Sequence, residues 1–385
     1  MKNKKVIAIF VCIFMLVTAV VGCSKDSKDQ GAEPLGGGIS AEGSHRHNEH
    51  GIDYELAFAA FAPDIIMINA GDLTVTWAEL FFYLRGNINE VFSYLGGLPE
   101  WAEEITQDST FADFVLLNAS ADVLEARVIE SGAAYIGVTL SEEDVQGIVE
   151  YFYSLTERFG GEEEFLRLIW EEDGCSSREL FDRLVGLSRL VDAIFYELYG
   201  ENGELVSDDD IIDDVAGDEY LMAKHILRLH ADDDDSDTAR TEIEEIWGLL
   251  NDFEGDEFEA FFDELMFEYS EDSGLAMSPQ GYLFQYGDMV REFYDAAVEL
   301  DIGQFSEIVE TSYGYHIIFR IPIDVDSVPS SGYITNDTRT LRERVMINIF
   351  NARLVSWRDE MEIEYTDAFE SINLAEVFAP CGCEE

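Results

Sequence analysis

The sequence predicts an α+β protein in which a mainly helical region is followed by a smaller unit of mixed strands and helices. Helical periodicity, with apolar residues every three or four positions, dominates to about residue 215. At Glu219 the pattern changes to alternation, and Y-L-M-A-K-H-I-L-R-L-H is typical of a strand. The segments that follow indicate helix, helix, strand, helix, strand and strand, so we expect a β-α-α-β-α-β-β unit of roughly 100 residues.

The N-terminus resembles an export signal. M-K-N-K-K is basic and precedes an apolar run, V-I-A-I-F-V-C-I-F-M-L-V-T-A-V, which is shorter than the about 20 residues that a spanning helix needs. V-V-G-C, ending at Cys23, fits the bacterial lipobox, in which the cysteine is lipidated and becomes the mature N-terminus. We therefore expect a lipoprotein signal peptide at 1–22 and anchorage to the outer face of the cell membrane through palmitate-type chains on Cys23. An uncleaved signal anchor is the alternative.

A polar tether, 23–60, is expected after the signal because glycine, serine and charged residues cannot bury enough apolar surface to fold. Its segment H-R-H-N-E-H, with His45, His47 and His50, is either a weak metal site or a flexible linker, and the lack of a second cluster favours the linker. Three cysteines remain beyond the anchor, which is no disulfide framework. Cys381 and Cys383 form either a redox or metal pair or, as their polar surroundings favour, part of a tail at 372–385.

The formal net charge of −58 bears on partners more than on fold. Phosphate backbones would be repelled, so we expect no nucleic-acid binding. Basic, newly exported chains would be attracted, although the charge is also explained by solubility alone. The body of the chain is large enough for two domains with cores of their own.

Several elements of the helical region can be placed from the sequence. I-M-I-N-A predicts a strand, Gly71 a turn, and Thr76 the cap of a following helix. Ser141, followed by three acidic residues, predicts another helix start with carboxylates at the positive end of its dipole. No paired-acid motif or phosphate loop stands out, so the acidic residues of this region are expected to form solvated helix faces.

The mixed unit carries a histidine on its first and last strands. Alternation places His225 on the same side as Leu221, Ala223, Leu227 and Leu229. The last strand lies in T-S-Y-G-Y-H-I-I-F-R, where Gly314 allows a tight entry and His316 turns away from Ile317 and Phe319. The acidic run 232–237 between the first strand and its helix is either a weak calcium site or, since it lacks EF-hand features, a solvated loop.

Four motifs in this order resemble the parvulin-type peptidyl-prolyl isomerase domain: A-K-H-I-L, F-x-x-L-x-x-E-Y-S-E-D, G-Y-L-F-x-x-G-x-M-V-x-E-F and T-S-Y-G-Y-H-I-I. With the lipobox and the helical flanks, the chain resembles the PrsA-type foldase lipoproteins, whose chaperone region is SurA-like. The resemblance implies a helical chaperone region at 61–216, an inserted isomerase domain with a four-stranded antiparallel sheet at 217–323, and a helix within 335–371 that completes the chaperone domain.

The resemblance also implies the site residues. His225 and His316 would be paired directly or through Thr311, and Asp272 occupies a position where parvulins carry cysteine or aspartate. Ser270 would be its polar neighbour. The proline pocket would be formed by Met289 and Phe293, one helical turn apart, together with Phe284. Taken without the resemblance, the apolar residues indicate core packing and each histidine a buried polar group.

An X-Pro bond rotates slowly, over a barrier of about 18 to 20 kcal/mol, and an isomerase needs only to bind the twisted amide best. We therefore expect no cofactor and no metal. The expected partners are unfolded, newly exported chains with X-Pro bonds; a homodimer is left open. The alternative is a holdase chaperone with a weakly active module, because S-P-Q-G-Y-L-F places Gly281 where parvulins have an apolar pocket wall. The acidic run disfavours phosphoserine-proline recognition, and the absence of alternating α/β halves disfavours a solute-binding lipoprotein.

Overall fold

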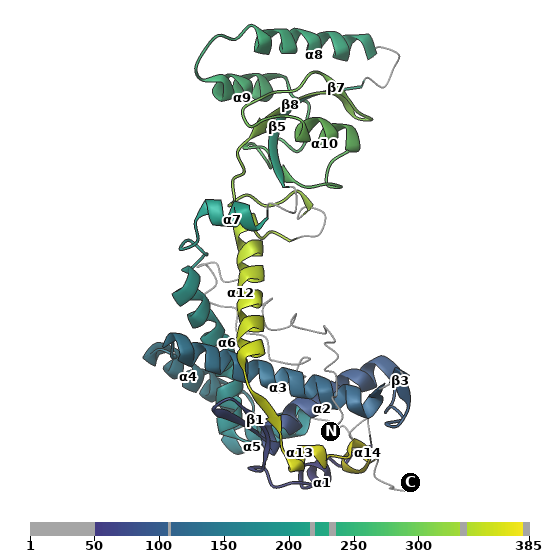
Figure 1. Cartoon of the computed structure of the whole chain (residues 1–385), viewed down its shortest axis with the longest axis vertical. Coiled ribbons are helices and arrows are strands. Elements are labelled where there is room, and N and C mark those ends of the chain that lie inside the picture. The colour runs from purple at the N-terminus through teal and green to yellow at the C-terminus, as the bar shows by residue number, and fades with distance from the viewer. Residues whose placement is uncertain (1–50, 107–108, 216–219, 231–235, 332–336, 380–385) are drawn as a thin grey trace. The chain divides into compact units, whose positions relative to one another are not determined.

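The computed structural model describes residues 51–106, 109–215, 220–230, 236–331 and 337–379, and it divides into two compact units (Figure 1). The first unit contains the chain up to Leu198 and from Phe350 onward, and the second extends from Tyr199 to Ile349. The predicted signal peptide, Cys23, the histidines of the tether, the acidic run up to 235, Cys381 and Cys383 lie outside the described residues. Within the described ranges, no helix is long and apolar enough to cross a membrane.

The first unit is mainly helical. Its elements in chain order are α1 (Tyr54–Phe58), β1 (Ile66–Ala70), β2 (Leu73–Thr76), α2 (Trp77–Leu95), β3 (Glu104–Thr106), β4 (Ser109–Thr110), α3 (Phe111–Ile136), α4 (Glu142–Arg158), α5 (Glu162–Asp173), α6 (Arg178–Tyr199), the second half of α12 (Leu341–Glu360), β9 (Ile363–Tyr365), α13 (Asp367–Glu370) and α14 (Leu374–Val377). Thr76 and Ser141 precede α2 and α4 as N-caps, as predicted.

A small sheet joins the two ends of the first unit. β1 lies between β2 and β9 and is antiparallel to both, and Ile68 is paired with Tyr365. The main core packs beside this sheet, with the side chains of Trp77 and Phe81 completely buried. A β-carbon at Gly132 on α3 would lie 2.2 Å from the ring of Trp357 on α12. The C-terminal segment is therefore an integral part of this unit.

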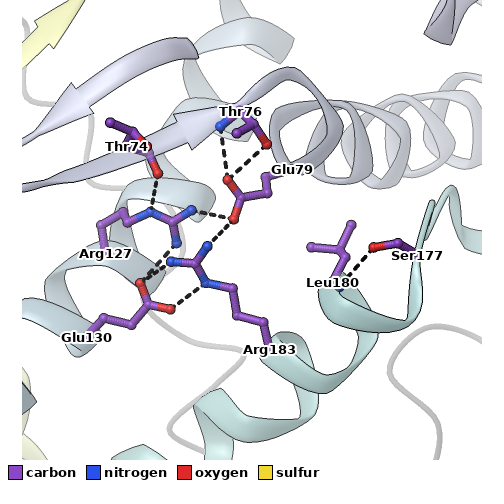
Figure 2. Close-up of polar contacts among 8 residues, drawn as sticks. All are labelled: Thr74, Thr76, Glu79, Arg127, Glu130, Ser177, Leu180 and Arg183. Carbon is purple, nitrogen blue, oxygen red and sulfur yellow. Dashed lines mark hydrogen bonds and ion pairs between the residues drawn. The ribbon is translucent and has the colours of Figure 1, made fainter. Parts of the chain in front are cut away.

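A buried ion network connects three helices of the first unit (Figure 2). We call Glu79, Arg127, Glu130 and Arg183 the ion network. Arg127 Nη2 lies 2.5 Å from Glu79 Oε1, Arg127 Nη1 lies 3.1 Å from Glu130 Oε2, and Arg183 forms ion pairs with both glutamates. The other oxygen of Glu79 accepts the backbone N–H of Thr76, at 2.9 Å, and so caps α2. The expectation of solvated helix faces is wrong for Glu79, which is buried because two arginines and a helix end compensate its charge.

The second unit contains the predicted β-α-α-β-α-β-β order. Its elements are α7 (Asp208–Asp214), β5 (Leu221–Leu229), α8 (Ser236–Asn251), α9 (Phe258–Tyr269), β6 (Tyr282–Phe284), α10 (Arg291–Val298), β7 (Val309–Glu310), β8 (Gly314–Ile321) and the first half of α12. The four strands form one antiparallel sheet in the order β6-β5-β8-β7. The predicted α+β class and the four-stranded sheet are confirmed.

Helices cover both faces of this sheet: α8 and α9 lie on one side and α10 on the other (Figure 1). On the α9 side, Phe319 packs against Phe262, with ring centroids 5.0 Å apart. Lys224 is buried on this side, and its Nζ lies 2.8 Å from Glu259 and 2.7 Å from Asp263. The α10 side carries a separate apolar cluster and the two predicted histidines. The sheet thus separates a structural core from the face where the candidate site lies.

Candidate active site

The two histidines meet because of the strand register. In the β5–β8 pairing, His225 is opposite Ile318 and Leu227 is opposite His316. Residues opposite one another in an antiparallel pair point to the same face, so the histidines are diagonal neighbours on the α10 side. Their Nδ1 atoms lie 3.1 Å apart and their rings are nearly parallel, with an interplanar angle of 11°. The predicted pair is therefore in direct contact.

A continuous hydrogen-bonded chain runs through this pair. His225 Nε2 lies 3.0 Å from Asp272 Oδ2, and His316 Nε2 lies 2.8 Å from Thr311 Oγ1. We call Asp272, His225, His316 and Thr311 the histidine chain. His225, His316 and Thr311 are each less than a tenth exposed, whereas Asp272 is half-buried at the open end of the chain. The four predicted catalytic positions thus come together from β5, β8 and two loops.

Asp272 is held as an anion. Burial by itself raises the pKa of its carboxyl, but hydrogen bonds from His225, Tyr282 and the backbone of Gly274 outweigh burial and hold the pKa well below its usual range. Burial, reinforced by His225 and His230 and opposed by Asp272, lowers the pKa of His316 to about 3. His316 is therefore neutral near pH 7, and the negative charge lies at the half-buried end of the histidine chain.

The ionised carboxylate determines the direction of the hydrogen bonds, because it can only accept. When His225 is neutral, its proton lies on Nε2 facing Asp272, and its Nδ1 accepts from His316 Nδ1–H. His316 Nε2 is then an acceptor and takes the hydroxyl proton of Thr311. The hydrogen-bond direction set at the carboxylate thus extends along the histidine chain to Thr311.

Phe293 provides an apolar wall beside both histidines. Its ring centroid lies 5.3 Å from that of His225 and 5.6 Å from that of His316, nearly perpendicular to each. Phe284 packs behind Phe293 at 5.7 Å and is completely buried. Met289 is half-buried at the edge of this cluster and retains surface that a ligand could contact.

The helical spacing predicted for Met289 and Phe293 is wrong. Helix α10 begins at Arg291, and Val290, its N-cap, has an extended conformation with ψ of 146°. Met289 therefore lies in the preceding turn, although it still packs against the same cluster. Asp288 favours this turn, since its carboxylate accepts the backbone N–H of Gln285 at 3.0 Å.

Ser270 and Gly314 shape the site from its edges. The hydroxyl oxygen of Ser270 accepts the backbone N–H of Leu227, at 3.1 Å, and so ties the end of α9 to β5. A β-carbon at Gly314 would lie 2.1 Å from the carbonyl oxygen of Arg228, so only glycine fits where β8 begins. The turn before it places Thr311, whose backbone N–H donates to Gly314 O at 2.9 Å.

Sequence reasoning missed Tyr282. Its hydroxyl donates to Asp272 Oδ2 at 2.5 Å, and its ring meets that of His225 edge-on at 5.6 Å. One signal was present: Tyr282 is two residues before Phe284, so both side chains point to the same face of β6. What it contacts could not be foreseen, because Asp272 reaches it through a loop.

Cys175 is a buried free thiol in the first unit. Burial raises the pKa of its thiol to about 12. It is therefore an unreactive core residue rather than a nucleophile.

The geometry and the family comparison agree on the class of domain. Residues 225–321 match the family model described as rotamase, PPIC-type PPIASE domain. This part of the chain is therefore a parvulin-type peptidyl-prolyl isomerase domain, and it contains every member of the histidine chain.

The chain is similar to PrsA foldases over a longer range. It is 24% identical over 292 residues to foldase protein PrsA of Caldanaerobacter subterraneus, covering 73% of this chain and 82% of that protein. It is 51% identical over 53 residues to foldase protein PrsA 4 of Bacillus cereus, which is 13% of this chain and 19% of that protein. In this second match, as in that with PrsA of a Geobacillus species, the chain spans about a fifth of the relative's length.

Solved structures of PrsA proteins are also similar to this chain, but they superpose on it poorly. PrsA from Bacillus cereus is 22% identical to this chain, and the match covers 72% of this chain and 99% of that one, with a TM-score of 0.28. The resemblance to PrsA foldases predicted from the motifs is confirmed. The SurA-like character of the helical region and the domain boundaries stay predictions; the matched segment lies inside the predicted 217–323.

Proposed function

We propose that this protein is a peptidyl-prolyl cis/trans isomerase and chaperone that assists the folding of exported proteins. The observation that carries the proposal is the histidine chain packed against Phe293 within a parvulin-type domain. The names of the PrsA relatives support the wider role of a foldase.

The proposed mechanism is electrostatic. In a planar X-Pro amide, conjugation places partial negative charge on the carbonyl oxygen, and twisting the bond returns electron density to the nitrogen. A fixed carboxylate beside that oxygen therefore disfavours the planar forms more than the twisted form. Asp272 would supply this charge, and the half-buried Met289 with Phe293 would hold the proline ring.

The histidines would act by holding Asp272 in place rather than by chemistry of their own. Each lacks freedom to move, since both nitrogens of each ring have a partner within 3.1 Å. No bond in the substrate is made or broken, so no group needs to deliver a proton to the peptide. The thiol nucleophile of some enzymes is absent here, where an aspartate occupies the position.

A refolding assay tests the isomerase. The full chain should accelerate the slow phase of a model protein whose refolding is limited by an X-Pro bond. His316→Ala should retain the folded sheet, seen by circular dichroism, and lose most of the acceleration. A variant that is folded and fully active would exclude a catalytic role for the histidine chain.

The same assay distinguishes the isomerase from the alternative, a holdase chaperone with a weakly active module. Gly281 has φ of +107°, and a β-carbon there would lie 2.9 Å from the carbonyl oxygen of Ala223, so this backbone cannot easily carry an apolar side chain. A weaker proline pocket would follow. Suppressed aggregation of an unfolded client without acceleration of its proline-limited phase would favour the holdase.

We further propose that the protein is anchored at the outer face of the membrane through lipidated Cys23. The basic start, the short apolar run and V-V-G-C support this location. Cys23→Ser should abolish incorporation of labelled palmitate and release the protein from membranes. Retention of both in the variant would rule out this anchor.

A further inference from the structure

We propose that Tyr282 is a positioning residue for Asp272, and that this chain uses a tyrosine hydroxyl to orient the carboxylate of its isomerase site. The proposal rests on the proposed function for its catalytic consequence, but the contact itself can be tested without any activity. Tyr282 lies in the G-Y-L-F motif, but the motif gives it no role.

The hydrogen bonds define the contact. An ionised carboxylate can only accept, so the Tyr282 hydroxyl is the donor at 2.5 Å to Asp272 Oδ2. His225 Nε2 reaches the same oxygen at 3.0 Å, and the backbone N–H of Gly274 reaches the other oxygen at 2.9 Å. Three donors from three segments therefore fix the plane of the carboxylate. Removing one would leave it free to rotate away from His225.

The backbone around Tyr282 is built for this contact. Gly281 adopts the left-handed region, and the next residue, Tyr282, pairs directly with Ala223 on β5. Ala223 is two residues before His225, so the tyrosine and histidine side chains share one face of the sheet. This chain thus has glycine at position 281, where parvulins have an apolar side chain, and the next residue, Tyr282, reaches the Asp272 carboxylate.

Gly274 leaves the space that the hydroxyl occupies. A β-carbon at Gly274 would lie 2.2 Å from the Tyr282 hydroxyl oxygen but 3.3 Å from the ring carbon that carries it. An alanine there would therefore push the hydroxyl aside, whereas a phenylalanine ring at 282 would nearly fit. This difference provides a second variant that acts mainly through the hydroxyl, since the same β-carbon would lie at an ordinary contact distance of 3.4 Å from Asp272 Oδ1.

In the described part of the chain, two titratable side chains contact the Asp272 carboxylate: His225 on β5 and Tyr282 on β6. His316 on β8 lies one ring further away. The adjacent Glu271 is directed elsewhere: its carboxylate accepts the backbone N–H of Leu229 at 2.8 Å and lies 3.5 Å from Arg228. A change in the titration of Asp272 after loss of the Tyr282 hydroxyl is therefore attributable to that hydroxyl.

The first experiment compares Tyr282→Phe with Tyr286→Phe in the full chain. Tyr286 is 69% exposed and packs on Tyr294, so it is a matched control that loses the same hydroxyl. Carbon-13 NMR of the Asp272 carboxyl should show its titration midpoint moved up by about one pH unit in Tyr282→Phe only. With an X-Pro peptide, kcat/KM should fall about tenfold, through kcat more than KM.

The second experiment is a double-mutant cycle. Gly274→Ala should reduce kcat/KM about tenfold in the wild-type background and cause little further loss when combined with Tyr282→Phe. Fully additive losses in kcat/KM would show that Gly274→Ala does not act through the Tyr282 hydroxyl and would contradict the proposal. An unchanged Asp272 midpoint and unchanged kcat in Tyr282→Phe, with only reduced thermal stability, would overturn the positioning role. Wild-type inactivity would instead refute the proposed function, while the NMR comparison would still decide the Tyr282 contact.

Discussion

The ion network of the first unit and the histidine chain of the second are both buried polar networks, but their charge balance differs. The ion network has two arginines and two glutamates, so its charges cancel. The histidine chain has one carboxylate, at one end, and no arginine or lysine among its members. Exposure alone does not separate the two: Arg127 is 1% and Arg183 36% exposed in the ion network, and the side chain of Asp272 is 16% exposed at the end of its chain.

The difference in charge balance separates a structural network from a functional one. In the balanced ion network the ion pairs hold helices together and leave no net charge for a ligand. A carboxylate that has no arginine or lysine partner, whose pKa is shifted by directed hydrogen bonds and whose side chain is partly exposed, is available to act on a substrate. Disrupting the ion network should therefore cost mainly stability, whereas disrupting the histidine chain should cost mainly activity.

Removing a charge from the ion network should cost the most stability. Glu79→Ala leaves Arg127 and Arg183 without one partner and removes the acceptor of the Thr76 backbone N–H at the start of α2. We expect the free energy of unfolding of the first unit to fall by about 3–5 kcal/mol, measured by hydrogen exchange in α2 and α3. Glu164→Ala, which breaks an exposed pair with Arg167, should leave it nearly unchanged. Equal effects of the two variants would contradict the comparison.

Neutralising the histidine chain should instead cost activity. Asp272→Asn keeps the shape of the side chain and removes its charge, so we expect kcat/KM for an X-Pro peptide to fall about 10²-fold, as for other groups that stabilise a transition state electrostatically. The control is Asp295→Asn on α10, an exposed residue paired with Arg291. Wild-type turnover by a folded Asp272→Asn protein would refute the electrostatic mechanism.

The two units should respond to pH with opposite signs. The pKa of His316 is lowered from 6.5 to about 3, so between these pH values the unfolded chain binds one more proton than the folded second unit. The free energy of unfolding of the second unit should therefore rise with pH in this range, by up to about 1.4 kcal/mol per pH unit. Burial and Asp122, opposed by Arg358, raise the pKa of Glu125 from 4.5 to about 7. The folded first unit then binds the extra proton, and its stability should fall as pH rises from 4.5 to 7.

Hydrogen exchange followed separately in each unit measures this pH dependence, because two units need not unfold together. Glu125→Gln should remove part of the slope in the first unit and leave the second unaffected. Slopes of the same sign in both units would show that the assigned groups do not dominate.

The smallest effect is expected at the end of the histidine chain. Thr311→Val is nearly isosteric but removes the hydroxyl that lies 2.8 Å from His316 Nε2. We expect a loss of about 1 kcal/mol in stability and a few-fold loss in kcat/KM. Thr311→Ser retains the hydroxyl and should lie close to wild type; a serine variant as impaired as the valine variant would point to the lost methyl group instead.

The order of elements in the second unit and the contact between its two histidines could both be predicted from the sequence. Periods of two and of 3.6 residues are local properties, so the succession of strands and helices could be read directly. The motif order around His225 and His316 was enough to expect them as partners across ninety-one positions. Gly314 could be assigned to the tight turn into the last strand, because a residue with a β-carbon rarely fits where two backbone segments come this close.

Which polar groups are buried together depends on the tertiary fold. Glu79 looked like one more surface acid, because its partners Arg127 and Arg183 follow 48 and 104 residues later on other helices. Tyr282 looked like a strand aromatic until the loop carrying Asp272 placed the carboxylate at its hydroxyl. A side chain's periodicity gives the face it occupies, but the charge state and hydrogen bonds of that side chain depend on distant segments that arrive only when the chain folds.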